Sequence, residues 1–67
     1  MPERSLSSQE RRVLEGLAAL SSTEAVAVEL GLDPATVRSR LRTAMKKLGV
    51  RTHAEAIAVA RGRAEID

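Results

Sequence analysis

The sequence contains no cysteine, phenylalanine, tyrosine or tryptophan, and it has no long hydrophobic run. Without cysteine, the chain can form neither a disulfide framework nor a cysteine-ligated zinc site, which fits a reducing cytosol. Without aromatic rings, it lacks the side chains on which proteins usually stack the bases of RNA or single strands. No apolar stretch approaches the roughly 18 to 20 residues of a membrane span, and no signal peptide is evident. We therefore expect a cytoplasmic protein with no membrane partner.

Charge is distributed unevenly along these 67 residues. The net charge is only +2, and the chain is long enough for a single small domain with a thin core. Residues 33–52 carry a net charge of +5, whereas residues 1–32 carry −2 and residues 53–67 carry −1. The cations of the basic segment are Arg38, Arg40, Arg42, Lys46, Lys47 and Arg51. This segment is therefore suited to an anionic partner.

Capping and stop signals predict four helices and hence a compact all-α domain. Ser7 and Glu10 have the spacing of a capping box, which opens a first helix expected over residues 8–19. Thr52 and Glu55 have the same spacing and open a last helix, after which the charged tail is expected to fray. The predicted organisation is a flexible N-terminus at residues 1–5, a helical domain at 6–62 and a flexible tail at 63–67.

A very short turn joins the two central helices. Ser21 and Ser22 offer the cap of the second helix, and Gly31 ends it. An aspartate cap, Asp33, and a proline then open the third helix, which is expected over Pro34–Leu48. A short helix, a tight glycine-containing turn and a longer helix follow one another in the order of a helix-turn-helix.

The third helix separates into distinct faces when its residues are placed at about 100° intervals. The side expected to be buried comprises Val37, Leu41, Ala44, Met45 and Leu48. One edge carries Arg38, Arg42 and Lys46, the other edge carries Arg40 and Lys47, and the outward face between them carries Ser39 and Thr43. In a major groove, flanking cations can meet phosphates while arginine pairs with guanine. The pattern therefore favours duplex DNA as the partner.

Other interpretations of the basic helix stay open on these residues alone. A charge run is often only a solvated face. A membrane-surface helix is disfavoured because its apolar side offers little depth of insertion. The principal alternative is a helical protein-interaction module that docks its basic helix on an acidic partner in the transcription machinery.

The segment LGLDPATVRSRLRTAMKKLGVRTHAEA combines a leucine-glycine turn, a capping residue, a Thr-Val pair, a lysine-leucine helix end and a polar cap. With the Ser7–Glu10 opening, it resembles the LuxR-type (GerE or NarL-like) DNA-binding domain of bacterial transcription regulators over about residues 6–60. The resemblance implies a regulator that places its third helix in the major groove, usually as a homodimer, with RNA polymerase as a further candidate partner. The stretch TVRSRLRTAMKKL is also similar to the DNA-reading part of a sigma factor.

The resemblance also implies roles for individual residues. The base-facing set is Arg38, Ser39 and Arg42. The predicted contacts to the DNA backbone are Thr23, Thr36, Arg40, Lys46, Lys47 and Arg51. The candidates for a dimer contact on the last helix are Ala54, Ala58, Val59 and Arg61. Alternatively, the alanines of that helix are only good helix formers and Ile57 closes the core.

Nothing in the sequence predicts catalysis, a metal site, a cofactor or a small-molecule ligand. Catalysis generally needs a nucleophile with a base, or paired carboxylates in a pocket, and neither is evident. The single histidine, His53, has no candidate metal-binding partners nearby in the sequence. We expect His53 to be a surface residue of a protein that is not an enzyme.

Overall fold

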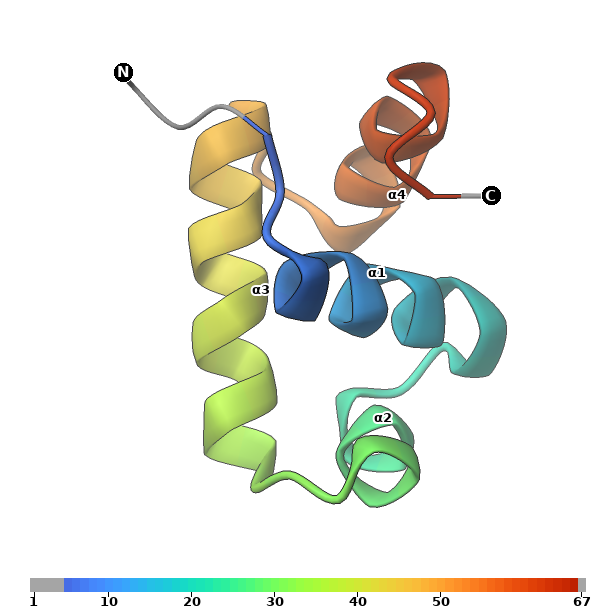
Figure 1. Ribbon diagram of the computed structural model, residues 1–67, viewed down its shortest axis with the longest axis vertical. Helices are drawn as coiled ribbons and strands as arrows, with labels where there is room; N and C mark the ends of the chain where they lie inside the picture. The colour runs from blue at the N-terminus through green and yellow to red at the C-terminus, as the bar shows by residue number, and fades with distance from the viewer. Residues whose placement is uncertain (1–4, 67) are drawn as a thin grey trace.

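The computed structural model describes residues 5–66, and it contains four helices. These are α1 (Ser8–Leu20), α2 (Thr23–Leu30), α3 (Pro34–Leu48) and α4 (His53–Gly62). Figure 1 shows α3 along one side of the molecule and α1 between α2 and α4 beside it. α1 contacts all three other helices, and α3 contacts both α2 and α4. The predicted all-α four-helix fold is confirmed.

Both predicted capping boxes are present. The Ser7 hydroxyl accepts a hydrogen bond from the Glu10 N–H at 3.1 Å, and the Glu10 carboxylate accepts one from the Ser7 N–H at 2.8 Å. Thr52 and Glu55 make the same reciprocal pair, at 3.1 and 3.2 Å. Each box satisfies N–H groups that a helix start leaves without an intrahelical partner. Local side-chain chemistry therefore sets where α1 and α4 begin.

Ser21 and Ser22 have different roles in the joint between α1 and α2. Ser21 adopts a left-handed conformation (φ 58°), and its N–H donates to the Leu17 carbonyl at 2.8 Å. It therefore ends α1, which extends one residue beyond its predicted end to Leu20. Ser22 alone caps α2, because its hydroxyl accepts from the Ala25 N–H at 3.2 Å.

All four helices contribute to one apolar core. Its largest fully buried side chains are Val13, Leu14, Val26, Val37 and Leu41. Burying each such side chain stabilises the fold by about 1.5–3 kcal/mol before the cost of ordering it. One expectation needs correction: Met45 is only partly buried, because it lies at the margin of the core beside a surface groove. On α4, Ala56 and Ala60 are buried, and Ile57 is partly buried against the core.

Gly16 allows α1 and α2 to approach closely. A β-carbon at this position would lie 3.2 Å from both γ-carbons of Val26. Val26 is fully buried, and its branched side chain has few alternative rotamers, so it has little room to move. Glycine inside a helix costs about 0.8–1 kcal/mol relative to alanine. Here the contact with Val26 explains why a small residue fits.

The tail after α4 lies against the domain through Glu65 and Ile66. Ile66 is only 6% exposed and belongs to the core. The Glu65 N–H donates to the Ala60 carbonyl at 2.8 Å, and the Glu65 carboxylate accepts from the Leu6 N–H at 3.2 Å. Ile66 is the only large apolar residue after Val59, and burying it joins the tail to the chain start. Residues 1–4 and 67, which were also expected to be flexible, lie outside the described residues.

Candidate nucleic-acid interface

A three-residue turn orients α3 against α2. Gly31 is left-handed (φ 68°), a conformation that glycine adopts readily, and its N–H donates to the Val28 carbonyl at 3.3 Å. The Leu32 N–H then donates to the Ala27 carbonyl at 2.9 Å. Asp33 occupies the predicted cap position of α3 without a side-chain capping hydrogen bond, so Pro34 at the first turn defines the start. This geometry is a helix-turn-helix.

α3 has one side in the core and one side open to solvent. Its 15 residues span about 22 Å at the usual rise per residue. The buried residues are Val37, Leu41, Ala44 and Leu48. The exposed residues on the opposite side include Arg38, Ser39, Arg42, Thr43 and Lys46. The three residues predicted to face bases are therefore all accessible on one helix.

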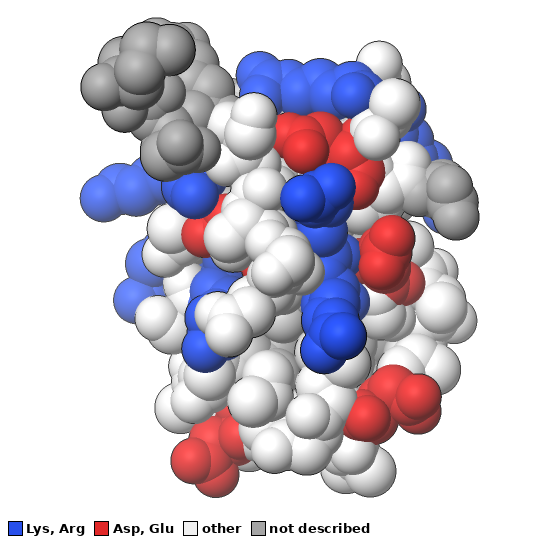
Figure 2. Space-filling model, in the orientation of Figure 1, with Lys and Arg blue, Asp and Glu red and all other residues white. Residues whose placement is uncertain are grey.

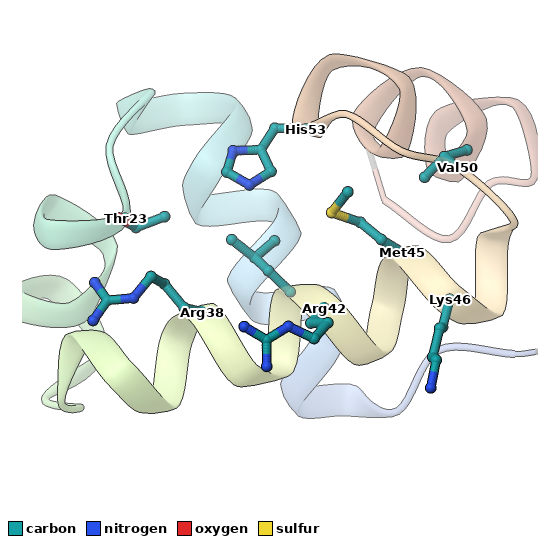
Figure 3. Close-up of a pocket in the computed structure, with 8 residues that line it drawn as sticks. Thr23, Arg38, Arg42, Met45, Lys46, Val50 and His53 are labelled. Atoms are coloured by element: carbon teal, nitrogen blue, oxygen red, sulfur yellow. The ribbon is translucent and has the colours of Figure 1, made fainter.

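A groove of about 420 Å³ runs along the edge of α3 where α2 and α4 begin. Figure 3 shows Arg38 and Arg42 projecting from α3 at this groove, with Thr23 as the first residue of α2. Lys46 also lines the groove, and its side chain extends from α3 away from His53. Met45 and Val50 line its apolar part. Among residues 5–66, no hydrogen bond or ion pair holds the charged groups of these three cations. They are available to an external anion.

One carboxylate lies close to this set of cations. Hydrogen bonds from its own N–H and from the Thr23 hydroxyl lower the pKa of Glu24, and the charge of Arg38 adds a smaller lowering. Glu24 therefore stays ionised at neutral pH. Its negative charge marks the α2 end of the groove as the less favourable end for a phosphate.

The other edge of α3 is tied to α1. Lys47 forms an ion pair with Glu10 at 2.9 Å, and it also donates to the Ser5 carbonyl at 3.5 Å. Arg40 donates a hydrogen bond to the Gln9 side chain. The two predicted backbone contacts on this edge thus have partners within the domain. Neither link was predicted from the sequence, because the two members of each lie more than 30 residues apart in the chain.

Glu10 is the only buried charged residue in the described part of the chain, at 5% exposure. Burial by itself raises the pKa of Glu10. The hydrogen bond from the Ser7 N–H and the hydrogen bond and charge of Lys47 outweigh burial, so the net pKa lies below 4.5. The carboxylate is therefore ionised at neutral pH and fixes Lys47 against α1.

Glu10→Gln is expected to lower the free energy of unfolding by about 1.5–3 kcal/mol near neutral pH, because glutamine hydrogen-bonds but leaves Lys47 without its counter-charge. The pKa of Glu10 is lower in the folded state than in the unfolded state. Its contribution is therefore complete above the ordinary pKa and is lost as the pH falls below that value through the lowered pKa of the folded state. Urea unfolding across this range should show the difference between wild type and variant shrinking at low pH.

Glu29→Gln provides the matched control for this prediction. Glu29 is exposed on α2, and the same substitution there should change stability by less than about 0.5 kcal/mol at any pH. A difference between wild type and Glu10→Gln that is the same at low and neutral pH would contradict an ionic role for Glu10.

The remaining predicted backbone contacts lie at different places around α3. Thr36 is partly buried beside Ser39 and Thr43. Arg51 is exposed in the joint before α4, and its N–H donates to the Glu55 carboxylate at 3.1 Å. Thr36 and Arg51 therefore lie near opposite ends of the helix.

Three of the four predicted dimer residues are exposed on α4, and the fourth, Val59, packs against the margin of the core. The exposed residues are Ala54, Ala58 and Arg61. The buried residues of the same helix are Ala56 and Ala60. α4 therefore offers a face of small side chains that the domain itself does not use.

Positive and negative side chains gather in different parts of the surface. On the face shown in Figure 2, Lys and Arg side chains gather along the α3 edge and in a column through the middle, whereas several acidic side chains lie at the lower end and the right side.

Residues 5–66 contain no group of three or more residues able to hold a metal ion and no helix long and apolar enough to cross a membrane.

The short α2, the tight turn and the solvent-facing basic α3 define a helix-turn-helix DNA-binding domain. The family model described as bacterial regulatory proteins of the luxR family (GerE) matches residues 4–60. The chain belongs to this family, which confirms the resemblance seen in its sequence and makes it a DNA-binding domain of a transcription regulator. No individually curated protein matches the chain.

Proposed function

We propose that this domain recognises specific duplex DNA sequences by placing α3 in the major groove. The observation that carries the proposal is the contrast between the two sides of α3. One side is buried in the core, and the other presents Arg38, Ser39 and Arg42, with no hydrogen bond or ion pair to either guanidinium among residues 5–66. A major groove about 12 Å wide admits one such helix, and arginine can pair with guanine O6 and N7.

The proposed backbone contacts surround this base-facing set. Lys46 continues the ridge of Arg38 and Arg42, and Thr23 approaches from the start of α2. Thr36 and Arg51 lie near the two ends of α3 and would meet phosphates beyond the read bases. Arg40 and Lys47 are also proposed to contact the DNA backbone. We expect their replacement to weaken DNA binding less, because Arg40 is hydrogen-bonded to Gln9 and Lys47 is paired with Glu10.

We further propose that two copies pair through the exposed face of α4 formed by Ala54 and Ala58, with Val59 and Arg61 at its margins. Small side chains permit close approach of two helices across a symmetry axis. The face is independent of the α3 edge that meets DNA, because α4 packs on the core through its opposite side. A dimer of this kind would read two half-sites.

Selection of bound duplexes from a random DNA pool at about 150 mM salt tests this function, because non-specific binding is weak there. We expect a motif, and its arrangement as an inverted repeat with half-sites about 10 base pairs apart would support the dimer. Recovery of no motif by a sample shown to be folded would contradict sequence-specific recognition. The basic helix would then be better explained as a docking surface for an acidic protein.

A further inference from the structure

We propose that His53 is a phosphate-contacting residue of the DNA interface and that its charge makes DNA binding depend on pH. The inference rests on the proposed docking of α3 and adds a residue to it. His53 is the first residue of α4, and it lies in the same groove as Arg38, Arg42 and Lys46. Figure 3 shows its ring pointing from α4 toward α3, across the groove from Arg38 and Arg42.

The position of His53 suits a DNA phosphate for geometric reasons. Arg38 and Arg42 lie on the helix that would enter the major groove of DNA, and His53 lines the same protein groove as these arginines but belongs to a different helix. In duplex DNA the bases lie inside the major groove, and the phosphates lie along its margins. A side chain held beside the recognition helix, but outside it, therefore meets the backbone. His53 is exposed, so the phosphate can approach without rearrangement of the core.

The groups around His53 make its charge state important for binding. α3 faces the groove with three cations and no acid. α2 contributes Thr23, and the neighbouring Glu24 carboxylate accepts hydrogen bonds from the hydroxyls of Ser22 and Thr23. On the side of α4, the Glu55 carboxylate accepts from the N–H groups of Arg51 and Thr52. Neither acid is a lining residue of the groove, so a bound phosphate would supply the anion that the groove itself lacks.

Protonation of His53 would therefore be coupled to DNA binding. Histidine changes charge between about pH 5 and pH 8, and a phosphate in the groove favours the imidazolium over the neutral ring. His53 is the only histidine of the chain, so no second imidazole contributes in this range. The domain should bind duplex DNA more tightly in slightly acidic solution, with one additional cation released from the DNA per bound proton.

The test measures affinity for a mixed-sequence duplex at about pH 6 and about pH 8 at constant ionic strength. Wild type is expected to bind about threefold to tenfold more tightly at the lower pH. His53→Gln should bind no more tightly than wild type at the higher pH and lose most of the pH dependence. His53→Arg should bind tightly at both pH values, with a salt slope steeper than that of His53→Gln by about 0.9.

Two comparisons make the test decisive. Thermal unfolding of each variant shows that it is folded, and any pH dependence left in His53→Gln measures groups other than His53. Equal pH dependence in wild type and His53→Gln would overturn the inference. Lys46→Ala, which changes another residue of the same groove, separates the role of His53 from the docking of α3. If Lys46→Ala weakens binding while the histidine variants do not differ, only the role of His53 fails. If neither position affects binding, the docking of α3 itself is wrong.

Discussion

Replacing Arg38 and Arg42 together with alanine is expected to remove most of the discrimination between the selected DNA site and unrelated duplexes. Each bidentate contact between an arginine and a base is worth about 1–3 kcal/mol of discrimination. Loss of both should reduce the ratio of specific to non-specific affinity by about 30-fold to 20,000-fold. Both side chains are exposed, so the free energy of unfolding should change by less than about 0.5 kcal/mol per substitution.

Competition binding of the selected duplex against scrambled duplexes measures this ratio. Lys46→Ala is the matched control, because Lys46 lies on the same exposed ridge of α3 but is assigned to a phosphate. It should weaken every duplex alike and reduce the salt slope by about 0.9. If the double variant also weakens all duplexes equally, Arg38 and Arg42 contact only the backbone, and base recognition must come from elsewhere.

Leu14→Ala is expected to cost about 2–5 kcal/mol of stability. Leu14 is fully buried in the middle of α1, where it contributes to the core shared by the helices. Alanine would lose the transfer free energy of the removed atoms and leave a cavity that close-packed neighbours only partly fill. A domain of this size has about 3–10 kcal/mol of total stability, so much of the variant should be unfolded near body temperature. Urea denaturation followed by circular dichroism measures the change.

Leu20→Ala offers the same substitution on the same helix at a position that is 42% exposed. It should cost much less than Leu14→Ala, because its side chain is already partly in water. Added DNA should restore folding of Leu14→Ala by mass action without a change in site preference. Changed preference in the folded fraction would mean that the α1 core also determines how α3 reads DNA.

Much of the fold was predictable because its signals are local. The capping boxes at Ser7 and Thr52 act over three residues, and the glycines at 31 and 49 end helices through their own backbone conformation. α3 has the bounds expected from its cap and its glycine. The Ser21 ending of α1 was not expected, because a left-handed serine depends on how the chain enters α2 as much as on its own preference.

The exposed face of the candidate site was also predictable, because α3 has a regular period. Spacing alone placed Arg38, Arg42 and Lys46 beside the buried stripe and Ser39 on the outward side. Met45 belonged to the predicted buried side, but it lies at the edge of the groove, since the position of α4 determines how far the core covers that side of α3. His53 entered the sequence analysis only as a surface residue, and the packing of α4 places it beside the arginines.

The sequence by itself determined the number of helices, most of their starts and ends, the helix-turn-helix order and the family, because hydrogen bonds and periodicity within about four residues encode them. Only the tertiary structure decided how the six cations of the basic segment are divided. It ties Arg40 and Lys47 to Gln9 and Glu10, and it leaves Arg38, Arg42 and Lys46 at an open groove shared with His53. The reason is that these links join residues far apart in the chain, and only the packing of α1 and α4 against α3 brings them within reach.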